Sequence, residues 1–574
     1  MHLKIFSFCD CHLINSCKQV ALALVIIFFT GKNSFSQHYK LSCEPEIEFI
    51  HENGFQIHWQ AEPLCEWIEW RRHDQTNYKI EGLNNKSSHQ KYQFQQGEQG
   101  QIYAFRFGCV INGDSTRSRD YFFATKSLSS GRIKVFFNHP VNTGAATFSP
   151  AQFLDRAIDD TIVSFINRAE STIDIAIYNT TSSNAVANFA EALNNAHNRG
   201  VRVRIVYDAE ASNLMINNLN SAIGRIPSRV GFNYGLMHNK FMVIDVESPD
   251  PGKPLVWTGS TNWTVAQLNG PDENNAILVQ DQALARAFTI EFEEMFGSTG
   301  AQPNSANARF GPDKTDNTPK SFIVGGRLIR LYFSPTDGTN QQLINTINSA
   351  NSDIFFASMI ITRNDLASAI INKVNQGISR TYGITDDSLA SPPAPAVWAL
   401  LRQGLPAGQM ISKNGFEGTM HHKFLFVDHF APQSDPQVLT GSHNWSNNAE
   451  NRNDENTLIV HDHDVVNHFY QAFLWMFNTI SGGSLHVSEV FKNDHSIRLY
   501  PNPVFNHLFF EFDHHQVQNL EIGVYDLGGR KVEHIKVHLL DSKGYIDVNQ
   551  LHSGAYVLKM NTGKQIFTAR FLKE

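Results

Sequence analysis

Two stretches of nine residues, MHNKFMVID at 237–245 and MHHKFLFVD at 420–428, place the same reactive side chains at the same offsets. In each, a histidine is followed by a lysine two residues later and an aspartate five residues after that: His238, Lys240 and Asp245, then His421, Lys423 and Asp428. Imidazole can attack phosphorus or transfer a proton near neutral pH, and ammonium groups can neutralise phosphoryl oxygens. If each stretch is a strand, its His and Lys share one face.

A second pattern follows each stretch. GSTNWT spans 259–264 and GSHNWS spans 441–446, and an acid stands eleven residues beyond each asparagine, in the strings DENNAIL and DENTLIV. The residues added are Ser260, Asn262 and Glu273 in the first copy and Ser442, Asn444 and Glu455 in the second. A single His-x-Lys pair is common on exposed strand edges. A six-residue set repeated at near-identical offsets indicates one site assembled from a duplicated domain.

Composition allows several domains with sizeable cores, since the chain has 574 residues, of which 41% are hydrophobic and 18% charged. A net charge of −8 does not favour broad attraction to polyanions, although a local basic cleft remains compatible with it. No cysteine follows residue 109, so no Cys-x-x-Cys zinc or redox site is available beyond it. We expect neither a metal nor an organic cofactor.

Residues 1–36 have the features of an export signal. The apolar run VALALVIIFF at 20–29 is too short to span a bilayer, and small residues precede Gln37, near which we expect the mature chain to begin. A membrane anchor is the alternative. In an oxidising compartment, two of the three cysteines left after cleavage could pair: Cys43, Cys65 and Cys109.

The rest of the chain divides into four parts. Residues 38–126 alternate like strands and loosely resemble a fibronectin type III β-sandwich. Residues 131–296 and 327–480 each contain a strand–helix–strand pattern, and the region between them, 297–326, is rich in Gly, Asn, Ser and Pro and is predicted to be an irregular linker. Residues 495–574 form a small β-rich module.

This last module, with LYPNPV at 499–504 and Gly-Arg and Gly-x-Tyr marks, resembles the C-terminal sorting domain of type IX secretion substrates. An unrelated β-sandwich is the alternative. The resemblance implies recognition by the type IX secretion machinery and export across an outer membrane. We therefore expect a secreted protein, extracellular or on the cell surface.

The duplicated motifs resemble the HKD motifs of the phospholipase D superfamily over residues 131–480. This resemblance implies an α/β fold: a duplicated α-β-α sandwich forming a pseudo-twofold pair, here flanked by N-terminal and C-terminal β-sandwiches. It implies that His238 is the nucleophile, forming a phosphohistidine, and that His421 is the acid, although the symmetry leaves the reverse open. We expect a monomer, because the internal repeat supplies both halves of the site.

The resemblance also assigns roles to the remaining motif residues. Lys240 and Lys423 would hold the phosphoryl oxygens together with Ser260, Asn262, Ser442 and Asn444. Glu273 and Glu455 would each accept a hydrogen bond from the histidine of their own half. Asp245 and Asp428 would support the site structurally.

The motifs indicate a reaction and leave the substrate open. The acidic balance, the secreted setting and an apolar insert at 390–410 favour phospholipid, although Trp398 in that insert could instead belong to a buried core helix. Nucleic acid is the alternative: four arginines, Arg202, Arg204, Arg225 and Arg229, fall near the first motif, but no dense basic run appears. A binding protein with a vestigial site is a third possibility, which the intact motifs disfavour.

Overall fold

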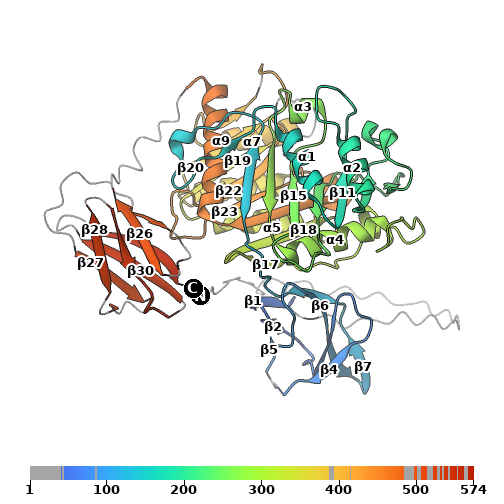
Figure 1. Cartoon of the computed structure of the whole chain (residues 1–574), viewed down its shortest axis with the longest axis horizontal. Coiled ribbons are helices and arrows are strands. Elements are labelled where there is room, and N and C mark those ends of the chain that lie inside the picture. Colours follow the sequence, from blue (N-terminus) through green and yellow to red (C-terminus); the bar gives the residue numbers. More distant parts are fainter. Residues whose placement is uncertain are drawn as a thin grey trace, which may run out of the picture. The chain divides into compact units, whose positions relative to one another are not determined.

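The computed structural model describes residues 41, 44–84, 87–386, 394–413 and 415–483, and most of the strands within 497–573 (Figure 1). The predicted export signal at 1–36, its cleavage point near Gln37 and Cys43 lie outside the described residues. The chain divides into two compact units, one up to residue 484 and one from residue 485 on.

The N-terminal region consists of two antiparallel sheets. One has the strand order β1-β2-β5, and the other has the order β4-β3-β6-β7 with β8 also paired to β6. Alternating side chains such as Phe55, Ile57 and Trp59 of β2 point into a shared core, as the period-two pattern predicts. Cys109 is a buried free thiol in this core. The strand bounds are β1 Glu46–His51, β2 Gly54–Gln60, β3 Trp67–Arg72, β4 Lys79–Gly82, β5 His89–Phe94, β6 Ile102–Ile111, β7 Asp114–Arg117 and β8 Tyr121–Ala124.

The first repeat is a mixed eight-stranded sheet in the order β10-β9-β16-β15-β14-β11-β12-β13. Every residue of β11 is buried, because helices cover both faces of the sheet (Figure 1). Residues of the usual capping types bound α4: the side chain of Asp281 accepts a hydrogen bond from the Leu284 N–H at its start, and Gly297 ends the helix with φ 74°. The elements are β9 Ile133–Phe137, β10 Gln152–Phe153, α1 Ile158–Arg168, β11 Thr172–Ile177, α2 Phe189–Asn198, β12 Arg202–Tyr207, β13 Gly224–Pro227, β14 Lys240–Ile244, β15 Leu255–Gly259, α3 Val265–Leu268, β16 Asn275–Val279 and α4 Gln282–Phe296.

The second repeat is a sheet in the order β17-β18-β24-β23-β22-β19-β20-β21, whose seven strands from β18 to β21 repeat the order of β9 to β13. The edge strands differ, because β17 precedes β18 and pairs antiparallel with it, whereas β10 follows β9 and pairs parallel. The predicted α/β class and the duplicated sandwich are therefore confirmed. Trp398 of α7 packs against the core of this repeat, in agreement with the core-helix alternative. The elements are β17 Ser321–Val324, β18 Arg327–Ser334, α5 Thr339–Ser349, β19 Asp353–Ser358, α6 Asn364–Asn375, β20 Arg380–Thr385, α7 Ala394–Gly404, β21 Met410–Ser412, β22 Lys423–Val427, β23 Gln437–Gly441, α8 Asn447–Asn451, β24 Glu455–His461 and α9 His463–Ser481.

Reciprocal hydrogen bonds join the two repeats. The side-chain amide of Asn275 donates to Thr440 Oγ1 at 2.8 Å, and that of Asn456 donates to Thr258 Oγ1 at 2.7 Å. Each pair joins one repeat to the other at corresponding places. This exchange is what an internal pseudo-twofold axis requires.

The region predicted to be an irregular linker has little regular structure but packs into the body of the unit. Lys314 lies fully buried, in contact with Glu291 of α4 and 3.1 Å from the Asp454 carboxylate of the second repeat. Burial alone would lower the pKa of Lys314, but the two carboxylates raise it above its usual value. The linker thus neutralises acids contributed by both repeats.

The C-terminal unit contains two antiparallel sheets, ordered β25-β26-β29-β28 and β27-β30-β31. Leu508, Phe510, Ile546 and Leu558 form part of its core. Residues 501–503 of its opening motif lie outside the described residues. Across the described ranges, no helix combines the length and apolarity needed to cross a bilayer. The strands are β25 Ile497–Tyr500, β26 His507–Phe512, β27 Glu521–Asp526, β28 Lys536–Leu540, β29 Lys543–Asp547, β30 Gly554–Asn561 and β31 Ile566–Lys573.

We predict that Lys314→Met lowers the free energy of unfolding by about 3–5 kcal/mol, because it leaves buried carboxylates without their cation. Urea denaturation followed by tryptophan fluorescence measures this. Lys253→Met is the matched control: Lys253 forms an exposed pair with Glu170 at 2.6 Å, and its loss should change the free energy of unfolding far less. Equal effects of the two substitutions would contradict the buried-pair argument.

Candidate active site

The two histidines and two lysines of the repeated motifs are buried near one another. Their exposed fractions are 6% for His238, 2% for Lys240, 5% for His421 and 1% for Lys423. Each lysine opens a central strand, β14 or β22, and its ammonium donates to the main-chain carbonyl of the histidine two residues earlier, at 2.7 and 2.8 Å. The i, i+2 spacing therefore places each predicted His and Lys together.

His238 is paired with an acid from the opposite repeat. Its Nδ1 lies 2.8 Å from Glu455 Oε2, and Glu455 Oε1 accepts a second hydrogen bond from Asn453 at 3.0 Å. Because a carboxylate only accepts, Nδ1 carries the proton and Nε2 keeps its lone pair. The prediction that Glu455 serves the histidine of its own half is wrong.

The corresponding prediction for Glu273 is also wrong. His421 Nδ1 lies 2.9 Å from the amide oxygen of Asn274, whereas Glu273 forms an ion pair with Lys413 at 3.4 Å. Glu273 approaches His421 only through its main-chain carbonyl, which accepts from the His421 N–H at 2.9 Å.

The sheet register explains the error at Glu273. Gly259 pairs with Ala276, seventeen residues later, whereas Gly441 pairs with Thr457, sixteen residues later. The first repeat therefore has one extra residue in the intervening loop. The structural counterpart of Glu455 is Asn274, and that of Glu273 is Asp454, whose carbonyl accepts from the His238 N–H at 2.9 Å.

The serines and asparagines of the second pattern lie on the loops after β15 and β23. Ser260 Oγ donates to Asn274 Oδ1 at 3.1 Å, and Ser442 Oγ accepts from the Asn456 N–H at 3.0 Å. The side-chain oxygens of Asn262 and Asn444 are buried without a hydrogen-bond partner among the described residues. Buried unsatisfied amides at matching positions are suited to a polar ligand.

The two motif aspartates lie at the far ends of β14 and β22 from the histidines. Asp245 accepts from the backbone N–H groups of Glu170, Ser171 and Thr172 at 2.7 to 3.2 Å. Asp428 accepts in the same way from the N–H groups of Asn351 and Ser352, at 2.7 and 2.9 Å. These contacts fix the end of each central strand and fit the predicted structural role.

Two residues at the site were missed from the sequence. One is Asn274. The other is Tyr178, whose ring centroid lies 4.8 Å from that of His238 and 5.1 Å from the Lys240 ammonium. The second repeat has Met359 there, with its sulfur 3.7 Å from Lys423 Nζ. Tyr178 and Met359 could have been identified from their matching positions in the sequence, because each directly follows a buried strand, β11 or β19.

The site holds more cationic groups than anions. Burial lowers the pKa of Lys423 to about 7 and holds that of Lys240 well below 10.5. Burial, and then the charges of Lys423 and Lys240, hold the pKa of His421 well below 6.5; burial also lowers the pKa of His238, but Glu455 opposes this. A bound anion would raise the pKa values of these groups, because it stabilises their charged forms.

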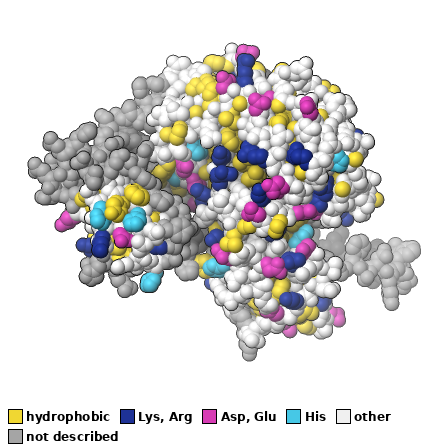
Figure 2. Space-filling model, in the orientation of Figure 1, with side chains coloured by type: hydrophobic (Ala, Val, Ile, Leu, Met, Phe, Trp, Pro, Cys, Tyr) yellow, Lys and Arg dark blue, Asp and Glu magenta, His cyan; other side chains and the backbone are white. Residues whose placement is uncertain are grey.

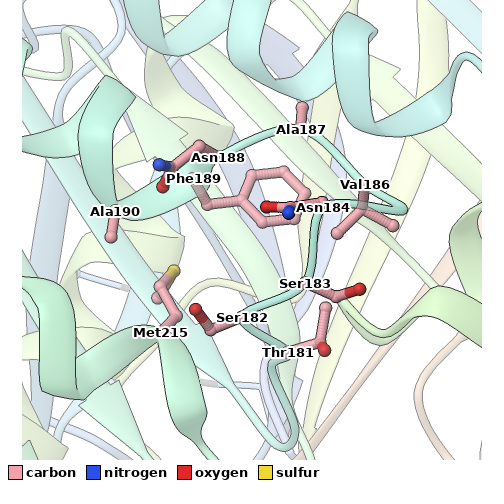
Figure 3. Close-up of a pocket in the computed structure, with 10 residues that line it drawn as sticks. All are labelled: Thr181, Ser182, Ser183, Asn184, Val186, Ala187, Asn188, Phe189, Ala190 and Met215. Atoms are coloured by element: carbon pink, nitrogen blue, oxygen red, sulfur yellow. The ribbon is translucent and has the colours of Figure 1, made fainter.

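The site residues do not form a metal centre of the usual kind: in the described part of the chain, no group of three or more His, Cys, Asp or Glu side chains is arranged to hold an ion. A cavity of about 360 Å³ lies in the first repeat, lined by hydroxyl and amide side chains including Ser182, Ser183, Asn184 and Asn188 (Figure 3). It adjoins the second pattern, because the N–H of Thr181 donates to the Trp263 carbonyl at 2.9 Å.

Comparisons with known proteins agree with this geometry. Residues 162–296 and 343–477 match a family described as "Cardiolipin synthase, PLD-like domain", and residues 498–574 match the "Secretion system C-terminal sorting domain". Mitochondrial cardiolipin hydrolase of Drosophila melanogaster is 35% identical over 153 residues, which is 24% of this chain and 57% of the fly protein. This chain thus matches little more than half the length of that relative.

Two further similarities are to bacterial proteins. Phospholipase D of Rickettsia prowazekii is 27% identical, and the match covers 32% of this chain and 78% of that protein. The crystal structure of Nuc, a phospholipase D family member from Salmonella typhimurium, is 20% identical with a TM-score of 0.23, covering 27% of this chain and 93% of that chain.

The matched repeats are the two halves that bring their His and Lys side chains into one buried site. The chain therefore contains two phospholipase D-like repeats and a C-terminal sorting domain of the type IX secretion system, which marks it as a secreted or cell-surface protein.

Proposed function

We propose that this protein is a phosphodiesterase of the phospholipase D type that hydrolyses head-group phosphodiester bonds of phospholipids through a phosphohistidine. The observation that carries the proposal is the buried cluster of two histidines and two lysines, in which Glu455 is the carboxylate hydrogen-bonded to His238. A phosphodiester anion supplies the charge that this cluster lacks.

In the first step, His238 Nε2 forms a bond to phosphorus while the bond from phosphorus to the leaving oxygen breaks. His421 transfers its proton to that oxygen, and the alcohol departs. In the second step, water attacks phosphorus, the N–P bond breaks, and the proton of the water returns to His421. Lys240 and Lys423 neutralise the phosphoryl oxygens throughout.

The two histidines have unequal partners, which supports this division of labour. Attack places positive charge on the ring of the nucleophile for the lifetime of the intermediate. Glu455 stabilises such charge on His238, whereas Asn274 offers His421 only an amide oxygen. His421 is accordingly the readier of the two to release a proton.

Phospholipid is favoured over nucleic acid because three of the four arginines near the first motif are paired with acids. Arg204 is fully buried against Asp174, Arg202 is paired with Glu247 at 2.6 Å, and Arg229 is paired with Asp313 at 2.9 Å. Basic and acidic side chains are interspersed on the face shown in Figure 2. Relatives named cardiolipin hydrolase and phospholipase D point the same way.

The full secreted chain should release head groups from phosphatidylcholine or cardiolipin vesicles, with EDTA present throughout, since the two lysines supply the cations. Head-group release and phosphatidate are measured by mass spectrometry. Plasmid DNA is the parallel substrate. Cleavage of DNA alone, weakening steeply with salt, would assign the nuclease alternative. Loss of all activity in EDTA, restored by added metal, would refute the lysine-based mechanism.

We expect His238→Ala to abolish any covalent phosphoenzyme and to lower activity at least about 1,000-fold. His421→Ala should still form the adduct from a substrate with a 4-nitrophenolate leaving group, which needs no proton. Intact-mass measurement after quenching without acid decides between them. An adduct on His421 in the His238→Ala protein would reverse the roles.

Matched substitutions of the two histidine partners provide the control. Glu455→Gln should slow adduct formation more than Asn274→Ala does, because only the first removes charge from the nucleophile's partner. Circular dichroism checks that both variants fold. Equal slowing would show that the carboxylate has no electrostatic role.

Anion affinity should depend on pH through Lys423, whose pKa is about 7. This ammonium is charged below its pKa, so tungstate should bind more weakly as pH rises through 7, by up to about tenfold per pH unit. Calorimetry measures the affinity. In Lys423→Arg the guanidinium stays charged, so the affinity should stay level over the same range. A parallel decline in both proteins would contradict the assignment.

A further inference from the structure

The loop that leads to His238 exposes large apolar side chains. Phe232, six residues before His238, is 94% exposed, and Val230 is 57% exposed. Most phenylalanines of the two repeats lie in their cores, for example Phe241 and Phe288 at 1% and 0%. Phe232 and Val230 together form a small exposed apolar patch beside the motif, and exposed apolar patches rimmed by polar residues mark interaction sites.

The second repeat has a corresponding loop. Phe416 stands five residues before His421 and is 42% exposed. An extended chain of this length reaches about 20 Å at most, so both phenylalanines lie within that distance of their own histidine. The two loops approach the site from opposite repeats, since one runs beside Asn453 and the other beside Pro271.

Basic side chains accompany the exposed loop of the first repeat. The guanidinium of Arg452 donates to the Phe232 carbonyl. A cavity of about 390 Å³ beside this loop is lined by Arg229, Arg309 and Asp313, among others. Arg229 is paired with Asp313, so Arg309 leaves the lining with an excess of positive charge, which suits a phosphate-bearing head group.

We propose that these residues form an interfacial rim, made up of Val230, Phe232, Phe416, Arg229, Arg309 and Arg452, that docks the catalytic site onto a bilayer containing anionic phospholipid. The apolar side chains enter the acyl boundary while the arginines contact head-group phosphates, as amphipathic interfacial segments do. The inference rests on the proposed phospholipid substrate and adds how that substrate is reached. Stacking of Phe232 on a nucleic-acid base is the competing use of the same side chain.

The experiment compares vesicle flotation of the full chain with turnover of a soluble substrate, bis(4-nitrophenyl) phosphate. In vesicles of phosphatidylcholine with phosphatidylglycerol, Phe232→Ser should lower the partition coefficient at least tenfold, and Val230→Ser with Phe232→Ser should lower it further. Soluble turnover should stay within twofold of the wild type. Vesicle flotation and soluble turnover are both measured on the folded full chain.

Phe148→Ser is the matched control, because Phe148 is 62% exposed but contacts His463, beyond the end of β24 remote from Glu455. It should leave flotation unchanged. Flotation of Phe232→Ser within twofold of wild type, or an equal loss in Phe148→Ser, would overturn the proposal. So would loss of single-stranded DNA binding in Phe232→Ser with vesicle binding intact. Vesicle binding through Phe232 without turnover of either substrate would refute the proposed function and leave the rim standing.

Discussion

The site depends on hydrogen bonds that cross the pseudo-twofold axis. The backbone N–H of each motif histidine donates to a carbonyl of the opposite repeat, Asp454 for His238 and Glu273 for His421. The side chains follow, with His238 oriented by Glu455 and His421 by Asn274. Neither repeat can orient its own histidine. Duplication is therefore a structural requirement of the site, because one copy would lack the partner that fixes its ring.

A second constraint is the cost of burying cations. Lys240 and Lys423 are almost fully buried, and the ammonium group of each donates one hydrogen bond to a main-chain carbonyl. Buried charge is tolerated where it is paired, as Lys314 is with Glu291 and Asp454. At the site the two lysines are only partly paired with acids, so their pKa values fall below the usual lysine value. The fold thus buries more cationic groups than anionic ones at the site, and an anionic ligand would neutralise this excess on binding.

Much of this architecture could be predicted from sequence. The nine-residue repeats predict the central strands, and the His-x-Lys spacing predicts that the histidine and the lysine of each repeat lie on the same face. The partners of the histidines could not be predicted in the same way, because equal spacing in sequence concealed an extra residue before Asn274 in the first repeat. Glu273 matches Glu455 in residue type and in its distance along the sequence from the preceding motif, yet the sheet register aligns Glu273 with Asp454. Counting along the chain cannot detect where a loop absorbs an insertion, and it cannot show that strands exchange partners across an axis.

Duplication within one chain also allows the halves to differ. In a symmetric dimer, a substitution changes both copies of a site together. Here one histidine has a carboxylate partner, Glu455, and the other has an amide partner, Asn274. Likewise, the first repeat has an aromatic ring at Tyr178 where the second repeat has a thioether at Met359. Two chemically identical imidazoles thereby acquire different proton affinities. The carboxylate of Glu455 favours positive charge on the His238 ring, whereas the amide of Asn274 leaves His421 the weaker base of the two. The departures from internal symmetry, more than the symmetry itself, are what give the two histidines different environments.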